Sequence, residues 1–262
     1  MTTTAKHTKT VEENAAEVTV RSCSGLSEFA TCIEIERAVW GSADVDIVPL
    51  PLFVVAAESG GQVLGAFAGD RMIGFTLAIA GVRGRKPFLH SHMTAVLRAF
   101  RNQGAGRKLK FFQREEALAR GMDLIEWTFD PLEIRNAYFN FRLGAIARRF
   151  IPNMYGITTS PLHGGLPTDR LVAEWHLRSA RVRRAIADKR PTRRKARGKE
   201  FARIRVPVDI GRIRSTKPDE AARMQAEIRL EFEHWLASGY AATGINRTDE
   251  AAEYLLEPWA ER

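Results

Sequence analysis

The stretch HSHMTAVLRAFRNQGAG, from His90 to Gly106, decides how this sequence is interpreted. It starts as a strand-like run and ends in a glycine-rich turn that opens a helix-forming segment. The first turn of a helix leaves backbone N–H groups without intrahelical partners, and the helix dipole adds positive potential there. Gly104 and Gly106 let an anion approach those groups. The turn therefore predicts a site for phosphate groups.

Basic side chains, Arg101, Arg107 and Lys108, add charge to this turn. The spacing is not that of a P-loop, and it is not the GxGxxG of a dinucleotide-binding loop. The glycines alone leave open a second interpretation, in which the turn is only a tight link between a strand and a helix.

The rest of the chain mixes strands and helices without regular βαβ alternation, which indicates an α+β fold with a mixed sheet. Strands are expected at residues 18–24, 86–96, 122–129, 145–151, 169–177, 201–210, 240–245 and 253–258, with a hairpin over 62–81 that turns at Gly69-Asp70. Helices are expected after the N-cap Ser27, within 49–60, from the glycine turn to Arg120, from the N-cap Asp130 to Gly144, and over 218–239. The helix that ends at Arg120 is expected to carry Leu109, Phe112 and Ala119 on its apolar face.

The net charge of +9 is concentrated in one segment. Residues 183–199 hold nine Lys or Arg and one Asp, a net +8, and contain no aromatic residue on which a base could stack. A solvated linker or exposed helix end is the simpler interpretation, and a contact with RNA, DNA or an anionic surface is the alternative. We therefore divide the chain into a disordered tail (1–17), a main domain (18–180), a basic linker (181–200) and a strand-helix-strand extension (201–262).

The signature Arg101-Asn102-Gln103-Gly104-Ala105-Gly106 resembles the Q/R-x-x-G-x-G/A loop of the GNAT superfamily of acyl-CoA N-acyltransferases. The order of elements from Val18 to about Leu177 is also similar to that of the superfamily. The resemblance implies a mostly antiparallel, twisted sheet flanked by helices, with the coenzyme A pyrophosphate on the signature loop and the pantetheine arm on the preceding strand. The resemblance also implies which residues bind acyl-CoA: Ala95, Val96, Leu97, Arg101, Asn102, Gln103, Gly104, Ala105, Gly106, Arg107, Lys108 and Asn136.

Two shorter likenesses concern mechanism and substrate. The pair His90 and His92 is similar to the histidine pair of the arylalkylamine N-acetyltransferases, where it helps to remove a proton from the amine. Residues 113–145 and 152–156 resemble a group of bacterial predicted acyltransferases, and this resemblance implies succinyl-CoA as the donor and an amino acid as the acceptor. These likenesses leave the acyl group open between acetyl, succinyl and another acyl group.

An amine attacks a thioester only as the free base, so the site must accept a proton, and imidazole suits that role. In a regular strand His90, His92 and Thr94 share one face. Their alternative role is that of satisfied histidines on a half-buried strand. Glu126 is expected on the strand that passes the thioester, as a further catalytic candidate.

The chain departs from the family at Asn140, where many GNAT enzymes have a tyrosine that protonates the leaving thiolate. Asparagine can only donate a hydrogen bond to the sulfur or to the acceptor. Asn140, Asp130 and Tyr155 are the candidates for acceptor binding, although Asp130 also suits a helix N-cap.

These patterns predict an enzyme that transfers an acyl group from acetyl-CoA or another acyl-CoA to the amine of a small molecule or amino acid, in a ternary complex and without a metal. A CoA-binding regulatory module is the first alternative, and an acyltransferase that acts on an RNA-associated substrate is the second. The polar N-terminus shows no signal peptide or membrane anchor, so we expect a cytoplasmic protein. The extension is expected to cap the acceptor side or to build a homodimer.

Overall fold

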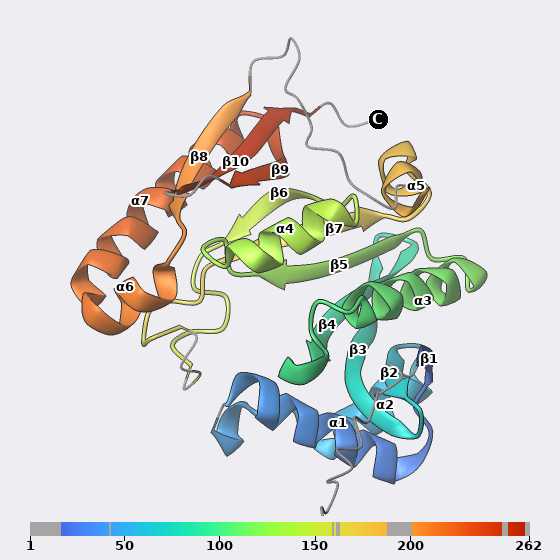
Figure 1. Ribbon diagram of the computed structural model, residues 1–262. Coiled ribbons are helices and arrows are strands. Elements are labelled where there is room, and N and C mark those ends of the chain that lie inside the picture. Colours follow the sequence, from blue (N-terminus) through green and yellow to red (C-terminus); the bar gives the residue numbers. More distant parts are fainter. Residues whose placement is uncertain are drawn as a thin grey trace, which may run out of the picture.

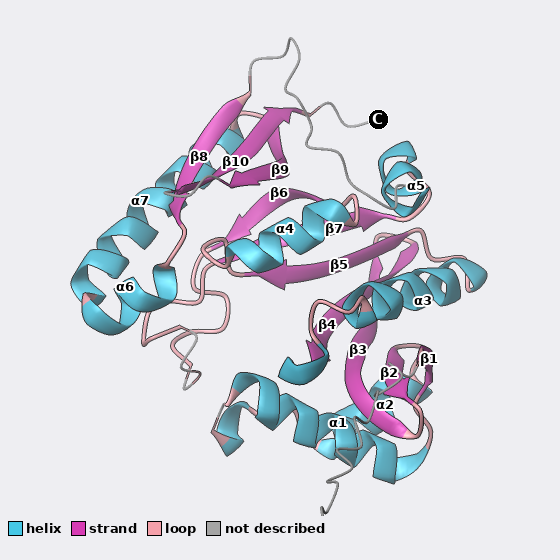
Figure 2. Ribbon diagram, in the orientation of Figure 1, coloured by secondary structure: helices cyan, strands magenta, loops and turns pink. Residues whose placement is uncertain are grey.

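Residues 17–41, 43–158, 160, 163–187, 201–247 and 251–259 are described by a computed structural model. Ten strands form one sheet in the order β1-β2-β3-β4-β5-β7-β6-β9-β10-β8 (Figures 1 and 2). The described strand pairs are antiparallel, except that β4 and β5 are parallel. The expected α+β fold with a mixed, mostly antiparallel sheet is confirmed.

The element bounds follow the sequence pattern closely. The strands are β1 (Val18–Ser22), β2 (Gln62–Ala68), β3 (Arg71–Arg83), β4 (Lys86–Val96), β5 (Leu124–Phe129), β6 (Ile146–Ile151), β7 (Arg170–His176), β8 (Ala202–Pro207), β9 (Tyr240–Arg247) and β10 (Ala251–Pro258). The helices are α1 (Gly25–Trp40), α2 (Leu50–Glu58), α3 (Ala105–Ala119), α4 (Ile134–Arg142), α5 (Ala180–Ala187), α6 (Ile210–Thr216) and α7 (Pro218–Ala237), with short 3-10 turns η1 (Asp44–Asp46) and η2 (Arg98–Phe100).

Helices α1 and α2 cover one face of β2, β3 and β4 at the blue end of the molecule (Figure 1). Phe53 of α2 packs between Phe29 and Phe75, with ring centroids 6.3 and 5.9 Å away. Leu109 of α3 packs in a separate cluster against β2 and β3. Burial of these apolar side chains holds the helices to the sheet at about 25 cal/mol per Å² removed from water.

The C-terminal extension continues the same sheet. Strands β6 and β9 join through one residue pair, Ala147 with Ala242. Aromatic side chains also hold the extension to the rest of the protein. The ring centroid of Phe232 in α7 lies 5.0 Å from that of Tyr254, and the Tyr254 hydroxyl donates a hydrogen bond to Pro131 O at 2.6 Å. The extension therefore shares one core with the main domain.

Two helix starts differ from expectation. Helix α1 begins at Gly25 after Ser24, because the Glu28 carboxylate accepts a hydrogen bond from the Ser24 backbone N–H at 2.7 Å, and Ser27 lies inside the helix. Helix α4 begins at Ile134 after Glu133, so Asp130 is not its N-cap. Asp130 instead stabilises the preceding turn by accepting from Leu132 N at 2.8 Å.

Helix α3 buries Leu109 as expected, but Phe112 and Ala119, the other two residues of the expected apolar face, are exposed. Phe112 is 36% exposed, and Ala105, Leu109, Gln113 and Ala117 face the protein at intervals of four residues. Polar residues within that stripe concealed it from a search for apolar spacing alone.

The expected basic linker begins as a helix, α5, whose Val182 is fully buried in the core. Helix α6 was not expected. The remaining linker residues, 188–200, and the expected N-terminal tail, 1–16, lie outside the described residues. In the described part of the chain no helix is long and apolar enough to cross a membrane.

Candidate active site

Strands β4 and β5 meet briefly and then separate. Leu89 pairs with Ile125 and His90 with Glu126, and β4 and β5 form no later pair. Strand β4 stays paired with β3 as far as Val96, whereas β5 pairs with β7. Among the described strands, none pairs with the edge of β4 beyond His90, and an extended ligand could use the backbone groups of this edge.

The backbone at the end of this free edge is partly used by the protein itself. Leu97 N donates to Ile73 O at 2.9 Å, and Val96 O accepts from Arg101 Nε at 3.0 Å. Ala95 is buried against α1 and α2. These bonds hold residues 95–97 and the signature arginine in one fixed arrangement.

A β-bulge at His92 changes which side chains share a face. Ala78 pairs with Ser91 and Leu77 with Met93, so His92 is the extra residue. The rings of His90 and His92 lie 6.1 Å apart, as expected for neighbours on one face. Thr94, however, lies 2.9 Å from Thr76 on the face covered by α3, so its expected place beside the histidines was wrong.

Both histidines have lowered pKa values. Desolvation lowers the pKa of His90, the nearby His92 lowers it further, and the Glu126 charge opposes the shift. Desolvation also lowers the pKa of His92, although His92 keeps more of its surface in water than His90 does. Both imidazoles are therefore neutral at pH 7 and can accept a proton.

Glu126, expected as a catalytic residue, is occupied by ion pairs. Arg83 contacts both of its oxygens at 2.5 and 2.8 Å, and Arg149 contacts one at 2.9 Å. Two guanidinium groups stabilise the ionised carboxylate and use its lone pairs. Both oxygens of Glu126 are therefore occupied by these arginines, and Arg149 is close enough to His90 for its charge to lower the pKa of His90.

The signature turn presents an open helix N-terminus. Gly104 precedes α3 with a φ of 88°, and no side chain caps the helix. A Cβ at Gly104 would meet nothing within 4 Å, so the space beside the turn is open. The N–H groups of Ala105, Gly106 and Arg107 belong to the first turn, because the first intrahelical bond runs from Lys108 N to Gly104 O. These donors suit the oxygen atoms of a diphosphate.

The side chains of the turn have separate contacts. Arg101, Asn102 and Gln103 are exposed, and Gln103 Nε2 donates to Ala99 O at 3.1 Å. Arg107 donates to Ala185 O at 3.0 Å, and Lys108 Nζ donates to Val18 O at 2.8 Å. The last two bonds tie α3 to α5 and β1, so they compete with the expected role of these side chains as phosphate ligands.

Helix α4 carries both Asn140, which is buried, and Asn136, which is exposed. Asn140 is 4% exposed, and its Oδ1 accepts from Trp127 Nε1 at 3.0 Å. Its Nδ2 is buried and has no hydrogen-bond partner among the residues that the structure describes. An unsatisfied buried donor is costly, so Nδ2 is suited to an acceptor atom of a bound molecule.

Asp130 and Tyr155 lie at the end of β5, and the structure assigns them different tasks. Asp130 is buried and binds Arg214 Nη2 at 2.8 Å, so it anchors the extension and is not free for an acceptor. Tyr155 is 43% exposed, and its hydroxyl lies 3.1 Å from Thr128 Oγ1. Arg170 lies over the Tyr155 ring at 5.3 Å.

Sequence reasoning missed the buried Lys110, which lies beside Trp127, and the half-buried Arg170, which lies beside Tyr155. Lys110 is 3% exposed, and burial lowers its pKa to about 7. Burial also lowers the pKa of Arg170, whose Nη2 lies 3.2 Å from His163 Nε2. The four-residue spacing of Leu109, Gln113 and Ala117 was the signal that could have placed Lys110 at the edge of a buried face.

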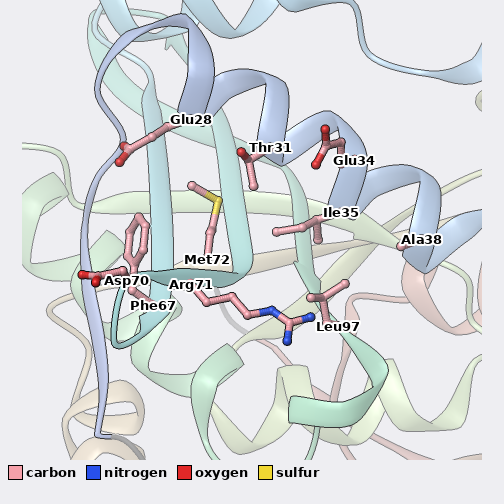
Figure 3. A pocket seen from close by; sticks show the side chains of 10 residues that line it. All are labelled: Glu28, Thr31, Glu34, Ile35, Ala38, Phe67, Asp70, Arg71, Met72 and Leu97. Atoms are coloured by element: carbon pink, nitrogen blue, oxygen red, sulfur yellow. The ribbon is translucent and has the colours of Figure 1, made fainter.

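Two hollows adjoin the predicted residues. One, of about 650 Å³, is lined by Glu126, Arg149 and Glu174 and by Tyr240 and Trp259 of the extension. The other, of about 480 Å³, lies between α1 and the β2–β3 hairpin, and in Figure 3 the Arg71 side chain extends towards Leu97 along it. Only the first hollow reaches a residue next to the histidine pair.

No family profile matches the sequence, and no curated protein matches it. Solved structures do match. A protein from Desulfovibrio desulfuricans assigned to the GNAT family of acetyltransferases superposes with a TM-score of 0.51, at 14% identity, over 62% of this chain and 99% of its own. A chain of the NatC complex bound to Gag peptide and CoA superposes with a TM-score of 0.50, at 13% identity, over 61% of this chain and 98% of its own. Arabidopsis thaliana NAA60 in complex with a bisubstrate analogue superposes with a TM-score of 0.50, at 12% identity, over 61% of this chain and 97% of its own.

These matches cover nearly the whole of each known chain and about three fifths of this one. The chain therefore shares the fold of these proteins over about three fifths of its length, and the remaining two fifths lie outside the matched part.

Proposed function

We propose that this protein is a GNAT acyltransferase that transfers an acyl group from acyl-CoA to an amine. The observation that carries the proposal is the separation of β4 from β5 directly before the uncapped N-terminus of α3. The gap suits an extended arm, and the helix terminus suits a diphosphate, which are the two parts of coenzyme A.

The chain's residues fit such a ligand. The backbone of Ala95 to Leu97 would bind the arm, and the N–H groups of residues 104–107 would bind the pyrophosphate, with Arg101 and Gln103 at its edge. Asn136 is exposed at the start of α4 and remains a candidate for a contact with the arm. The orphaned Asn140 Nδ2 supplies a hydrogen-bond donor under the sheet.

The proposed chemistry is direct attack. The bound amine forms a bond to the acyl carbon, the C–S bond breaks, and the amine proton passes to His90 or His92 and then to water. Cysteine does not fit as a nucleophile, because Cys32 is buried in the core, and its contact with Cys23 together with burial raises the pKa of its thiol.

The hollow of about 650 Å³ is the proposed acceptor region, because Glu126 lines it and pairs with His90. Its charged residues would recognise a small amine that also carries polar groups, such as an amino acid. Tyr240 and Trp259 make the extension part of this region. Acetyl and succinyl donors both remain candidates, and the cytoplasm remains the expected compartment.

A CoA-binding module without turnover is the second candidate, favoured by the replacement of the family tyrosine with Asn140. The RNA-associated alternative depends on the basic run, most of which lies outside the described residues. A homodimer likewise remains a prediction.

Calorimetry with CoA and thiol release from acetyl-CoA and succinyl-CoA, across amines and D- and L-amino acids, test the proposal. Gly104→Glu should weaken CoA binding more than tenfold, since the new side chain fills the open space and repels phosphate. Gly69→Glu is the matched control: Gly69 also has a positive φ, of 58°, with nothing within 4 Å of a Cβ, but it lies in the β2–β3 turn. Binding without turnover would favour the regulatory module, and no binding would refute the proposal.

A further inference from the structure

Lys110 lies at the point where β4 and β5 separate. Its Nζ lies 2.7 Å from Ser91 Oγ on β4 and 4.1 Å from the ring centroid of Trp127 on β5. Ser91 and Trp127 each follow directly after the last paired residues, His90 and Glu126. The Lys110 amine therefore contacts both strands where β4 and β5 begin to separate, on the face of the sheet that α3 covers.

The surroundings of Lys110 contain hydrogen-bond partners but no counter-charge. Besides Ser91, its Nζ contacts Gln113 Oε1 at 3.1 Å, and no carboxylate pairs with it in the described part of the chain. His90, on the other face of β4, is close enough for the Lys110 charge to lower the pKa of His90, and Glu116 of the same helix binds Gln62 of β2. A structural lysine normally keeps its amine in water or in an ion pair, so this position needs another explanation.

The same place holds two of the buried polar atoms that lack partners, Asn140 Nδ2 and Gln113 Nε2. Trp127 links them to the lysine: its ring lies under Nζ and its Nε1 donates to Asn140 Oδ1. Lys110, Gln113 and Asn140 thus offer three N–H groups where the two strands separate. Such a set suits a group that gains negative charge.

We propose that Lys110 donates a proton to the sulfur that leaves during acyl transfer, a role that rests on the acyltransferase function proposed above. The amine nitrogen forms a bond to the acyl carbon, and the C–S electron pair leaves with the sulfur. The sulfur takes a proton from the Lys110 ammonium, while the amine gives one to an imidazole. Water then returns the proton from the imidazole to Lys110, so that the protons balance.

The proton affinity of Lys110 fits this step. Burial lowers the pKa of Lys110 to about 7. A thiol of the cysteine type has a pKa of about 8.5, so the transfer from such an ammonium to a thiolate is favourable, whereas from an ordinary lysine, at about 10.4, it is not. Lys110 would thereby fill the role that Asn140 cannot.

The first test needs no substrate. NMR titration of the lysine Cε resonances in the full chain should reveal one lysine that titrates near pH 7 and is absent from Lys110→Met. If no lysine titrates below about pH 9, the amine is an ordinary one and the proposal fails.

The second test is kinetic. Lys110→Met and Lys110→Gln should lower kcat by about a hundredfold or more, with a KM for acyl-CoA within a few-fold of the wild type. The fall of kcat above pH 7 should disappear in both variants. Gln keeps a hydrogen-bond donor, so recovery in Lys110→Gln would assign a merely structural role to Lys110.

Lys217→Met is the control, because Lys217 is exposed and pairs with Glu220 on the surface. If the wild type turns over and both Lys110 variants do so equally well, this inference fails while the acyltransferase function stands. If the wild type binds no CoA, both fail together.

Discussion

The buried ion pair between Asp130 and Arg214 should be the main electrostatic tie between the GNAT fold and the extension. Their side chains are 7% and 4% exposed and meet at 2.8 Å. Burial alone would raise the pKa of Asp130, but His163, the Arg214 charge and the Leu132 N–H outweigh it and hold the pKa below its usual value. Arg214→Met removes the cation and leaves a buried carboxylate without it.

Removing one partner of a buried pair costs about 3–5 kcal/mol, because the remaining charge is desolvated and uncompensated. For a chain of this size each kcal/mol moves the midpoint by about 2–4 °C, so Arg214→Met should lower the Tm by about 6–20 °C. The double variant Asp130→Asn, Arg214→Met should recover part of the loss, since no unpaired charge stays buried.

Thermal unfolding followed by circular dichroism measures the Tm of Arg214→Met and that of the double variant. The pH dependence gives the sign: a carboxyl with a lowered pKa stabilises the fold above about pH 4, and this contribution is lost as pH falls through the folded pKa. The difference between wild type and Arg214→Met should therefore shrink on acidification.

Arg212→Met is the matched control on the same helix, because Arg212 and Asp209 are 72% and 53% exposed, and such pairs contribute about 0–1 kcal/mol. Equal Tm losses in Arg212→Met and Arg214→Met, or a double variant less stable than Arg214→Met, would refute the reasoning.

Three further outcomes are expected. Burial raises the pKa of Glu36 against the opposing Val48 N–H, so stability should fall as pH rises above about 4.3, and Glu36→Gln should remove this slope and raise the Tm at pH 7 in calorimetry. Because the pKa of His90 is lowered, the acid limb of kcat should have its midpoint below about 6.5, and His90→Gln should lower kcat about a hundredfold. Tyr155→Phe should raise the acceptor KM in steady-state assays without changing the CoA affinity or the Tm, because Tyr155 is exposed and its hydroxyl bonds to the half-buried Thr128.

Most of the secondary structure could be predicted because it depends on local patterns. The hairpin over 62–81, the strand over 86–96 and the helix after Gly104 follow from turn residues and from apolar periodicity. The errors have local causes too: a Glu28 side chain moved the start of α1, and polar residues in the buried stripe of α3 concealed its true face.

The candidate site was predictable only in part. The glycine turn and the His90–His92 pair were evident from spacing, because each lies within one short segment. Glu126 lies beside His90, and Asp130 directly follows β5. Their partners, Arg149 and Arg214, come from β6 and α6 and could not be predicted from the segments that hold the two carboxylates.

The sequence alone thus determined the elements, the glycine turn before α3 and the pair of imidazoles, since these depend on neighbours within a few residues of each other. Only the tertiary structure decided which charged side chains are neutralised. It paired Glu126 with two arginines, and among the described residues it gave Lys110 no carboxylate partner. Burial and ion pairing depend on segments far apart in the chain, and these set the charge of each group and therefore its chemistry.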